Sequence, residues 1–316
     1  MTQKLAPSPI VNIDLAGYCP ADPSYLQIRA RINHLINHYM HVDRLSDHLS
    51  DLATQFSQPH TRHWEPIDWQ AINPTQIIGV KAKIFTLVLS DATEIEAPIR
   101  EYSRESWQYL QTLHPEMAHF VGGSRHDDGS LQMPGIWEKE ERQHAPAFSK
   151  IYHQLTGEKL QPKPNSVTGY SPTEASWEAV QDHLISRIST EWGASAVYLW
   201  LMAHSTGALQ QAIAQPFQDE VNHLAKFWGF SQWTFGASYG EQLQGATRNL
   251  LSLAKHHQEE PTHGNELLHS GHSTKELAHA IELTFSLMRV MVRLRKWNLE
   301  LSMSYLRHLF GAAPCL

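Results

Sequence analysis

Two short stretches of this sequence place an acidic pair and a histidine inside apolar helical stripes. They read KEERQH around Glu141 and QDEVNH around Glu220, so each glutamate is followed three positions later by a histidine. Steps of three and four residues from Glu141 reach Trp137, His144 and Phe148, which puts the polar pair on an apolar helix face. A charged side chain in a buried stripe is costly unless it is paired or binds a metal. The two motifs therefore predict buried metal ligands.

The bare Glu-x-x-His pattern occurs six times in the chain, so each copy must be weighed by its surroundings. The copy at Glu116 follows a proline and runs into a glycine pair, which indicates a helix end or a short turn. The copies at Glu260 and Glu266 lie among prolines and glycines, without a long helix. Glu276 stands in STKE, a capping box at a helix start, so we expect its histidine, His279, to be solvated.

Helical periodicity dominates the rest of the chain, and we find no convincing alternating strand. The 316 residues, 41% of them hydrophobic, are enough for a deep core. Long helices joined by loops of about a dozen residues favour an all-α antiparallel bundle. The predicted helices cover residues 24–56, 75–113, 133–157, 173–213, 216–257 with breaks near Gly229 and Gly236, and 273–310.

Composition excludes several classes of protein. The net charge of −7 gives no basic footprint for nucleic acid, and the longest apolar run, residues 193–203, is about half of the ~20 residues that a membrane span needs. Cys19 and Cys315 lack the spacing of a thiolate metal site. We therefore expect a cytoplasmic protein without a membrane span, and the oligomeric state stays open, a homodimer included.

Two further glutamates complete the candidate ligand set, one before each Glu-x-x-His motif. Glu96 shares its face with apolar residues such as Phe85 and Leu89, whereas its acidic neighbours share theirs with polar residues. Glu191 continues the stripe that includes Leu184. Two Glu-x-x-His helices plus one glutamate from each of two other helices form the ligand pattern of a two-metal site in a helical bundle.

This order of ligands resembles the ferritin-like di-iron carboxylate oxidases, and within them it is most similar to the soluble acyl-carrier-protein desaturases. Those enzymes carry E-E-x-x-H and D-E-x-x-H motifs, and T-E-E-A-x-P where this chain reads TEIEAP. The resemblance covers roughly residues 75–230. It implies a ferritin-like antiparallel four-helix bundle with flanking helices, and two iron ions, or manganese in their place, held by Glu96, Glu141, His144, Glu191, Glu220 and His223.

The resemblance covers only the middle of the chain, and the predicted helices suggest how the remaining segments are organised around it. The resemblance implies a di-iron four-helix core over residues 75–230. An N-terminal segment with one helix, residues 1–70, would precede the core, and C-terminal helices in residues 231–316 would pack on it within a single domain. Glu141 and Glu220 would bridge the two ions.

The activity implied is oxygen activation by an oxidoreductase that desaturates or hydroxylates a small apolar or acyl substrate, with electrons from an external donor protein. Alternatives are N-oxygenation or another oxidation at the same site, and non-catalytic iron binding. Three family features are absent, because Ala194, Phe148 and Pro216 stand where relatives carry a threonine, a radical tyrosine and a third histidine.

Some neighbours of the ligands have two interpretations. The aromatic residues are either walls of a substrate pocket or ordinary core: Trp137, Phe148, Tyr198 and Phe217. Asp219 is either a solvated acid, which is the commoner case, or a group that orients a ligand histidine. Gly193 indicates either a π-bulge or close helix packing.

The C-terminal helix concentrates positive charge in an otherwise acidic chain, at Arg289, Arg293, Arg295, Lys296 and Arg307. Such a patch can steer an acidic partner. If the resemblance extends to substrate delivery, an acyl carrier protein would dock here; otherwise the patch is a solvated helix face.

Overall fold

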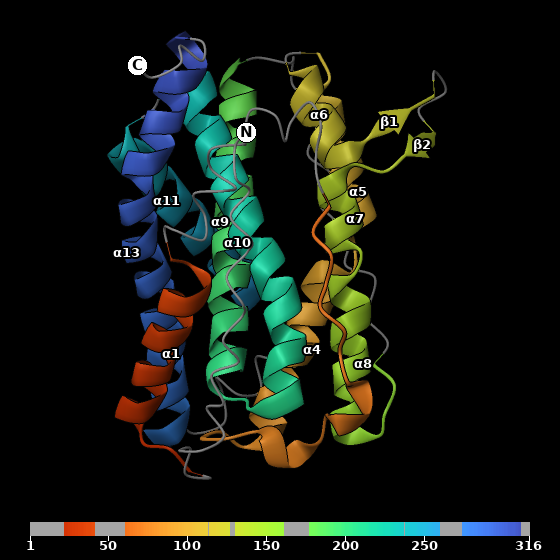
Figure 1. Cartoon of the computed structure of the whole chain (residues 1–316), viewed down its shortest axis with the longest axis vertical. Coiled ribbons are helices and arrows are strands. Elements are labelled where there is room, and N and C mark those ends of the chain that lie inside the picture. Colours follow the sequence, from red (N-terminus) through yellow and green to blue (C-terminus); the bar gives the residue numbers. More distant parts are fainter. Residues whose placement is uncertain are drawn as a thin grey trace, which may run out of the picture.

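The computed structural model describes residues 22–41, 61–112, 114–126, 130–160, 177–236, 238–259 and 274–310. These residues form an all-α fold (Figure 1). The helices are α1 (Tyr25–Tyr39), α4 (Ala82–Glu96), α5 (Ile99–Leu110), α6 (Pro115–Gly122), α7 (Ile136–Glu141), α8 (His144–Thr156), α9 (Trp177–Ala203), α10 (Gly207–Phe235), α11 (Tyr239–Glu259) and α13 (Thr274–Phe310). Two 3-10 turns, η2 (Trp69–Ala71) and η3 (Pro74–Gln76), precede α4.

One small sheet accompanies the described helices. The strands β1 (Ser124–Arg125) and β2 (Leu131–Met133) pair antiparallel, with Ser124 opposite Met133. The sequence patterns gave no strand here, because two to three residues are too few to show alternation.

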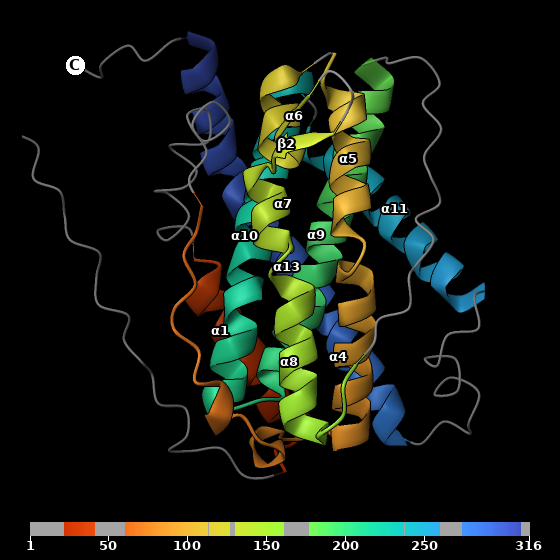
Figure 2. The ribbon, with the colours of Figure 1, turned by 90° about the vertical axis from the view of Figure 1, so that its right-hand side faces the viewer.

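Helices α9 and α10 pack along each other through the centre of the fold, and α4 packs on α8. Contacts of α4 with α9 and of α8 with α10 join the two pairs (Figure 2). Outside them, α13 contacts α9, α1 and α10, and α11 contacts α9. Gly193 on α9 faces Leu250 of α11, and α9 is α-helical throughout, so this glycine serves close helix packing rather than a π-bulge.

The helices of these two pairs form four columns, two of them interrupted and two continuous. In Figure 2, α5 continues the line of α4 and α7 that of α8, while α9 and α10 run through. The predicted helix 75–113 divides after Glu96, where Pro98 lacks a backbone N–H for helix pairing. The predicted helix 133–157 divides at residues 142–143, between Glu141 and His144.

Other predicted boundaries were wrong for identifiable reasons. The chain reverses at residues 204–206 rather than near 214, and Gly207 has a φ of +56°, a conformation that glycine tolerates. Helix α10 then runs through Pro216 and past Gly229, and ends at Gly236 as expected. Helix α1 ends at Tyr39, and the rest of its predicted range, from residue 42, lies outside the described residues.

Among the described residues, no helix combines the length and the apolar character that crossing a membrane would need.

Candidate metal centre

The structure brings all six candidate ligands together in the interior of the helical fold. Each side chain is nearly inaccessible to solvent, from 0% exposed for the two histidines to 7% for Glu96. They form two groups of four, whose ligand atoms lie within 4.8 Å of one another: Glu96, Glu141, His144 and Glu220; and Glu141, Glu191, Glu220 and His223. Glu141 and Glu220 belong to both groups.

The contacts of Glu141 show how the two groups are joined. Its Oε2 lies 3.0 Å from Nδ1 of His144, and its Oε1 lies 2.7 Å from Nδ1 of His223. Nδ1 of His144 also lies 3.1 Å from Oε1 of Glu220, and Nδ1 of His223 lies 3.6 Å from Oε2 of Glu191. Both imidazoles therefore direct the same nitrogen toward the carboxylates.

The outer nitrogen of each histidine contacts an acid from the other motif. Nε2 of His144 lies 3.2 Å from Oδ2 of Asp219, which directly precedes Glu220. Nε2 of His223 lies 2.9 Å from Oε2 of Glu140, which directly precedes Glu141. Ligand histidines commonly donate their second N–H to such a carboxylate, which fixes the ring and its tautomer.

This crossed pattern explains the acidic pair in each motif. The second acid of the pair faces the centre, and the first holds the histidine of the opposite helix. Asp219 is 0% exposed, so the interpretation of a solvated acid is wrong. Sequence reasoning did not single out Glu140, although its place beside Glu141 repeats that of Asp219 beside Glu220 and was an available signal.

A segment far away in the sequence closes over the outer acids. The backbone N–H of Arg62 donates to Oε1 of Glu140 at 2.7 Å, and its Nε donates to Oδ1 of Asp219 at 2.5 Å. Nε1 of Trp64 donates to Oδ2 of Asp219 at 2.7 Å, and its ring stacks near His144. One irregular segment thus binds both acids that contact the outer nitrogens of the histidines. No local sequence pattern at residues 61–65 could indicate this role.

The buried carboxyl groups have strongly perturbed pKa values. Burial and repulsion from Glu141 raise the pKa of Glu96 to about 7. Burial, with the charges of Glu141 and Glu191, raises the pKa of Glu220 well above its ordinary value. Without added positive charge, the site could not keep all of its carboxyl groups ionised at neutral pH.

The pKa values of the two histidines are also raised, which for an imidazole favours the charged form. Burial alone would lower the pKa of His144 and of His223, but the charge of Glu141 and the surrounding acids raise both well above the ordinary value. Burial would likewise raise the pKa of Glu141, yet the two imidazoles hold it below its usual range. The centre therefore attracts cations strongly, whether protons or metal ions.

Several polar atoms at this centre lack hydrogen-bond partners of good geometry. They are Nδ1 of His144 and of His223, Oε1 of Glu141, and both carboxylate oxygens of Glu220. Buried polar groups are normally satisfied, so each orphan needs an explanation. All of these atoms converge on the shared interior of the two groups, which fits the ligand positions of bound ions.

The four predicted pocket residues are all buried, each at most 1% exposed. Two line the histidines: Trp137 packs near His223, and Tyr198 packs near His144. Phe148 packs against Tyr198, one layer further from the histidines. The Tyr198 hydroxyl also donates to Oε1 of Glu96. Phe217 instead packs against Tyr39. Among the described residues, its ring makes no stacking or edge contact with either ligand histidine.

The other Glu-x-x-His copies do not join this centre. Glu116 is exposed on α6, a short helix of eight residues rather than a turn. His279 was expected to be solvated, but its side chain is only 15% exposed and lies 3.1 Å from Glu282. The copies at Glu260 and Glu266 fall outside the described residues.

Comparison of the chain with protein-family models, with curated proteins and with solved structures found no match. Fold and site define the class: an all-α protein with buried carboxylate and histidine groups that could hold metal ions.

Proposed function

We propose that the chain is a ferritin-like di-metal oxidoreductase that uses O₂ to desaturate or hydroxylate a small apolar or acyl substrate. The observation that carries the proposal is the pair of four-ligand groups that share Glu141 and Glu220. Four carboxylates carry a charge of −4, which two divalent ions would balance. The same charge without ions would be costly in a buried site.

The donor set favours iron or manganese. Carboxylates and imidazoles suit these metals, and the described residues at the centre offer only these two kinds of ligand. When bound and reduced, such a pair of ions supplies the activation of O₂ and the attack on an unreactive C–H bond.

The residues around the ligands would position them and keep water out. Asp219 and Glu140 would fix the ring planes of the two histidines, so that each Nδ1 stays directed at the ions. Tyr198 holds Glu96 through its hydroxyl, and the rings of Trp137 and Phe148 supply apolar surface beside the centre. A dry, apolar surrounding is what oxidation of an apolar substrate requires.

Delivery of the substrate by an acyl carrier protein would need an exposed basic surface on α13. Arg295 and Lys296 are exposed on α13, but Arg293 is buried and its guanidinium donates to Asn37. The side chain of Arg307 lies outside the described set. The basic patch is therefore smaller than the sequence pattern indicated, and a free small molecule is the competing form of the substrate.

Metal content in matched double variants tests the proposal. Glu141→Ala with His144→Ala should abolish iron binding at the centre, because it removes a shared ligand and a histidine. Glu116→Ala with His119→Ala removes the same pair of residue types from α6 and should retain the iron. Equal iron in the two double variants would end the assignment.

A second measurement separates catalysis from storage. An oxygenase should consume O₂ in proportion to an oxidised organic product when supplied with an electron donor and an apolar acid. Iron uptake with O₂ consumption but no organic product, across free and carrier-bound acids, would support iron binding alone.

A further inference from the structure

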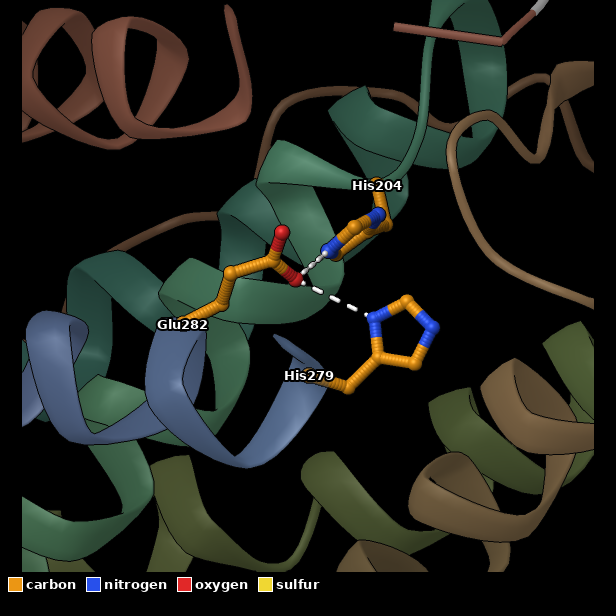
Figure 3. Close-up of side chains that lie close together, drawn as sticks. All are labelled: His204, His279 and Glu282. Carbon is orange, nitrogen blue, oxygen red and sulfur yellow. Dashed lines mark hydrogen bonds and ion pairs between the residues drawn. The ribbon is translucent and has the colours of Figure 1, made fainter. Parts of the chain in front are cut away.

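Three titratable side chains meet away from the centre described above. His204 follows the last residue of α9, and His279 and Glu282 lie one turn apart on α13. Figure 3 shows the three side chains directed toward one another. Oε2 of Glu282 lies 3.0 Å from Nε2 of His204 and 3.1 Å from Nδ1 of His279.

The surroundings of His204 fix which nitrogen faces the cluster. Its Nδ1 lies 2.9 Å from the backbone oxygen of Ile78, which can only accept a hydrogen bond, so Nδ1 carries the hydrogen. In the neutral imidazole, Nε2 then presents a lone pair toward Glu282. Two acceptors at 3.0 Å repel each other unless a proton or a metal ion lies between them. An outer N–H donated to a backbone carbonyl is also the usual arrangement of a ligand histidine.

Burial and ring packing hold the three side chains in place. The side chains of His204 and Glu282 are 0% and 4% exposed, while that of His279 is 15% exposed. Trp200 covers the His204 ring at a centroid distance of 4.4 Å. Of the three side chains, that of His279 is the most exposed, so a water ligand would reach a bound ion most readily beside it.

We propose that His204, His279 and Glu282 form a separate mononuclear site for a divalent transition-metal ion of the zinc type. Each offers one ligand atom, and these atoms lie within 4.8 Å of one another. Two imidazoles and one carboxylate, with water in the fourth position, form a known zinc ligand set. With bonds of about 2.1 Å, tetrahedral ligand atoms stand roughly 3.4 Å apart, so the two observed contacts need to widen by only a few tenths of an ångström.

This ligand set differs from that of the four-carboxylate centre. One carboxylate leaves a net positive charge around a divalent ion, and two imidazoles favour zinc, cobalt, nickel or copper over calcium and magnesium. The site joins α13 to the turn between α9 and α10, so a bound ion would tie the C-terminal helix to the rest of the fold. It does not depend on the proposed oxidation.

Zinc-edge anomalous scattering from crystals of the full chain, stripped with a chelator and soaked in Zn²⁺, is the direct test. We expect a peak among the three side chains, in addition to any zinc at the carboxylate centre. No peak there at saturating zinc would overturn the proposal and leave a hydrogen-bonded ionic cluster.

Variants give a second, independent readout. His279→Asn should remove this peak and weaken the corresponding zinc-binding phase in calorimetry by at least about a hundredfold, since loss of an outer partner alone costs 10–100-fold. Glu282→Gln should do the same if the histidine variant fails to fold. The control is His126→Asn, an exposed histidine between β1 and β2. Retention of the peak and of the affinity in both site variants would contradict the assignment.

Discussion

If two ions bind as proposed, the crossed hydrogen bonds predict that Asp219 sets the affinity for the ion beside His144, and Glu140 the affinity for the ion beside His223. Asp219→Asn keeps the side-chain size but removes the charge that three donors share, those of His144, Trp64 and Arg62. The amide also turns one acceptor into a donor, so at least one of these three contacts becomes repulsive.

The expected magnitude follows from the role of such partners. Loss of the acid behind a ligand histidine typically costs 10–100-fold in metal affinity, or about 1.4 to 2.8 kcal/mol. Because Asp219 contacts His144 and not His223, the loss should fall mainly on the ion beside His144. Glu140→Gln should produce the mirror effect on the ion beside His223.

Iron-edge anomalous scattering measures the two positions separately. Crystals equilibrated with a graded series of chelator concentrations would give the occupancy of each ion in each variant. Asp182→Asn removes an exposed acid from α9 and serves as the matched control. Equal losses at both positions in both variants would refute the crossed assignment, and unchanged occupancies would show that these acids serve only the fold.

Two further predictions concern stability. The pKa of Glu96 is raised to about 7 in the folded state, so the metal-free protein binds extra protons and should lose stability as pH rises from about 4.5 to 7. Urea denaturation across this range should show the decline, and Glu96→Gln should flatten it; a metal-free protein that becomes more stable over the same range would contradict the sign. Arg62→Ala removes donors to Asp219 and to the backbone oxygen of Gln215, and should lower the free energy of unfolding by about 1.5 to 3 kcal/mol. Arg100→Ala, at an exposed position on α5, should change it by less than about 0.5 kcal/mol, and equal effects of the two substitutions would remove the proposed role of Arg62.

The sequence predicted the helical class because helical periodicity is local. The six candidate ligands stood out because each interrupts an apolar stripe, and their meeting was expected from the ligand pattern of two-metal helical bundles. A buried carboxylate in an apolar stripe is visible from spacing alone, as at Glu96 and Glu191. The turn at residues 204–206 was missed because Gly207 reads as an ordinary helix position until its positive φ is known.

Contacts between distant segments were beyond the reach of any local pattern. Arg62 and Asp219 are 157 residues apart, and nothing near either residue indicates the other. The same holds for His204 and Glu282, which the turn after α9 and the start of α13 bring together. His279 was predicted to be solvated because a capping box accounted for the Glu-x-x-His pattern at Glu276. Its burial comes instead from contacts with Trp200 on α9 and with His204 just after it.

The helix breaks after Glu96 and Glu141 indicate which ligands of the centre can move most easily. Glu96 and Glu141 are each the last residue of a helix, next to a break, whereas Glu191 and Glu220 lie in the middle of continuous helices. A residue at a helix end can rotate with fewer backbone hydrogen bonds to disturb. If bound ions change charge or spacing, we expect Glu96 and Glu141, at the ends of α4 and α7, to shift more than Glu191 and Glu220, inside α9 and α10. Stiffening either break would then restrict the movement of the carboxylates without removing a single ligand.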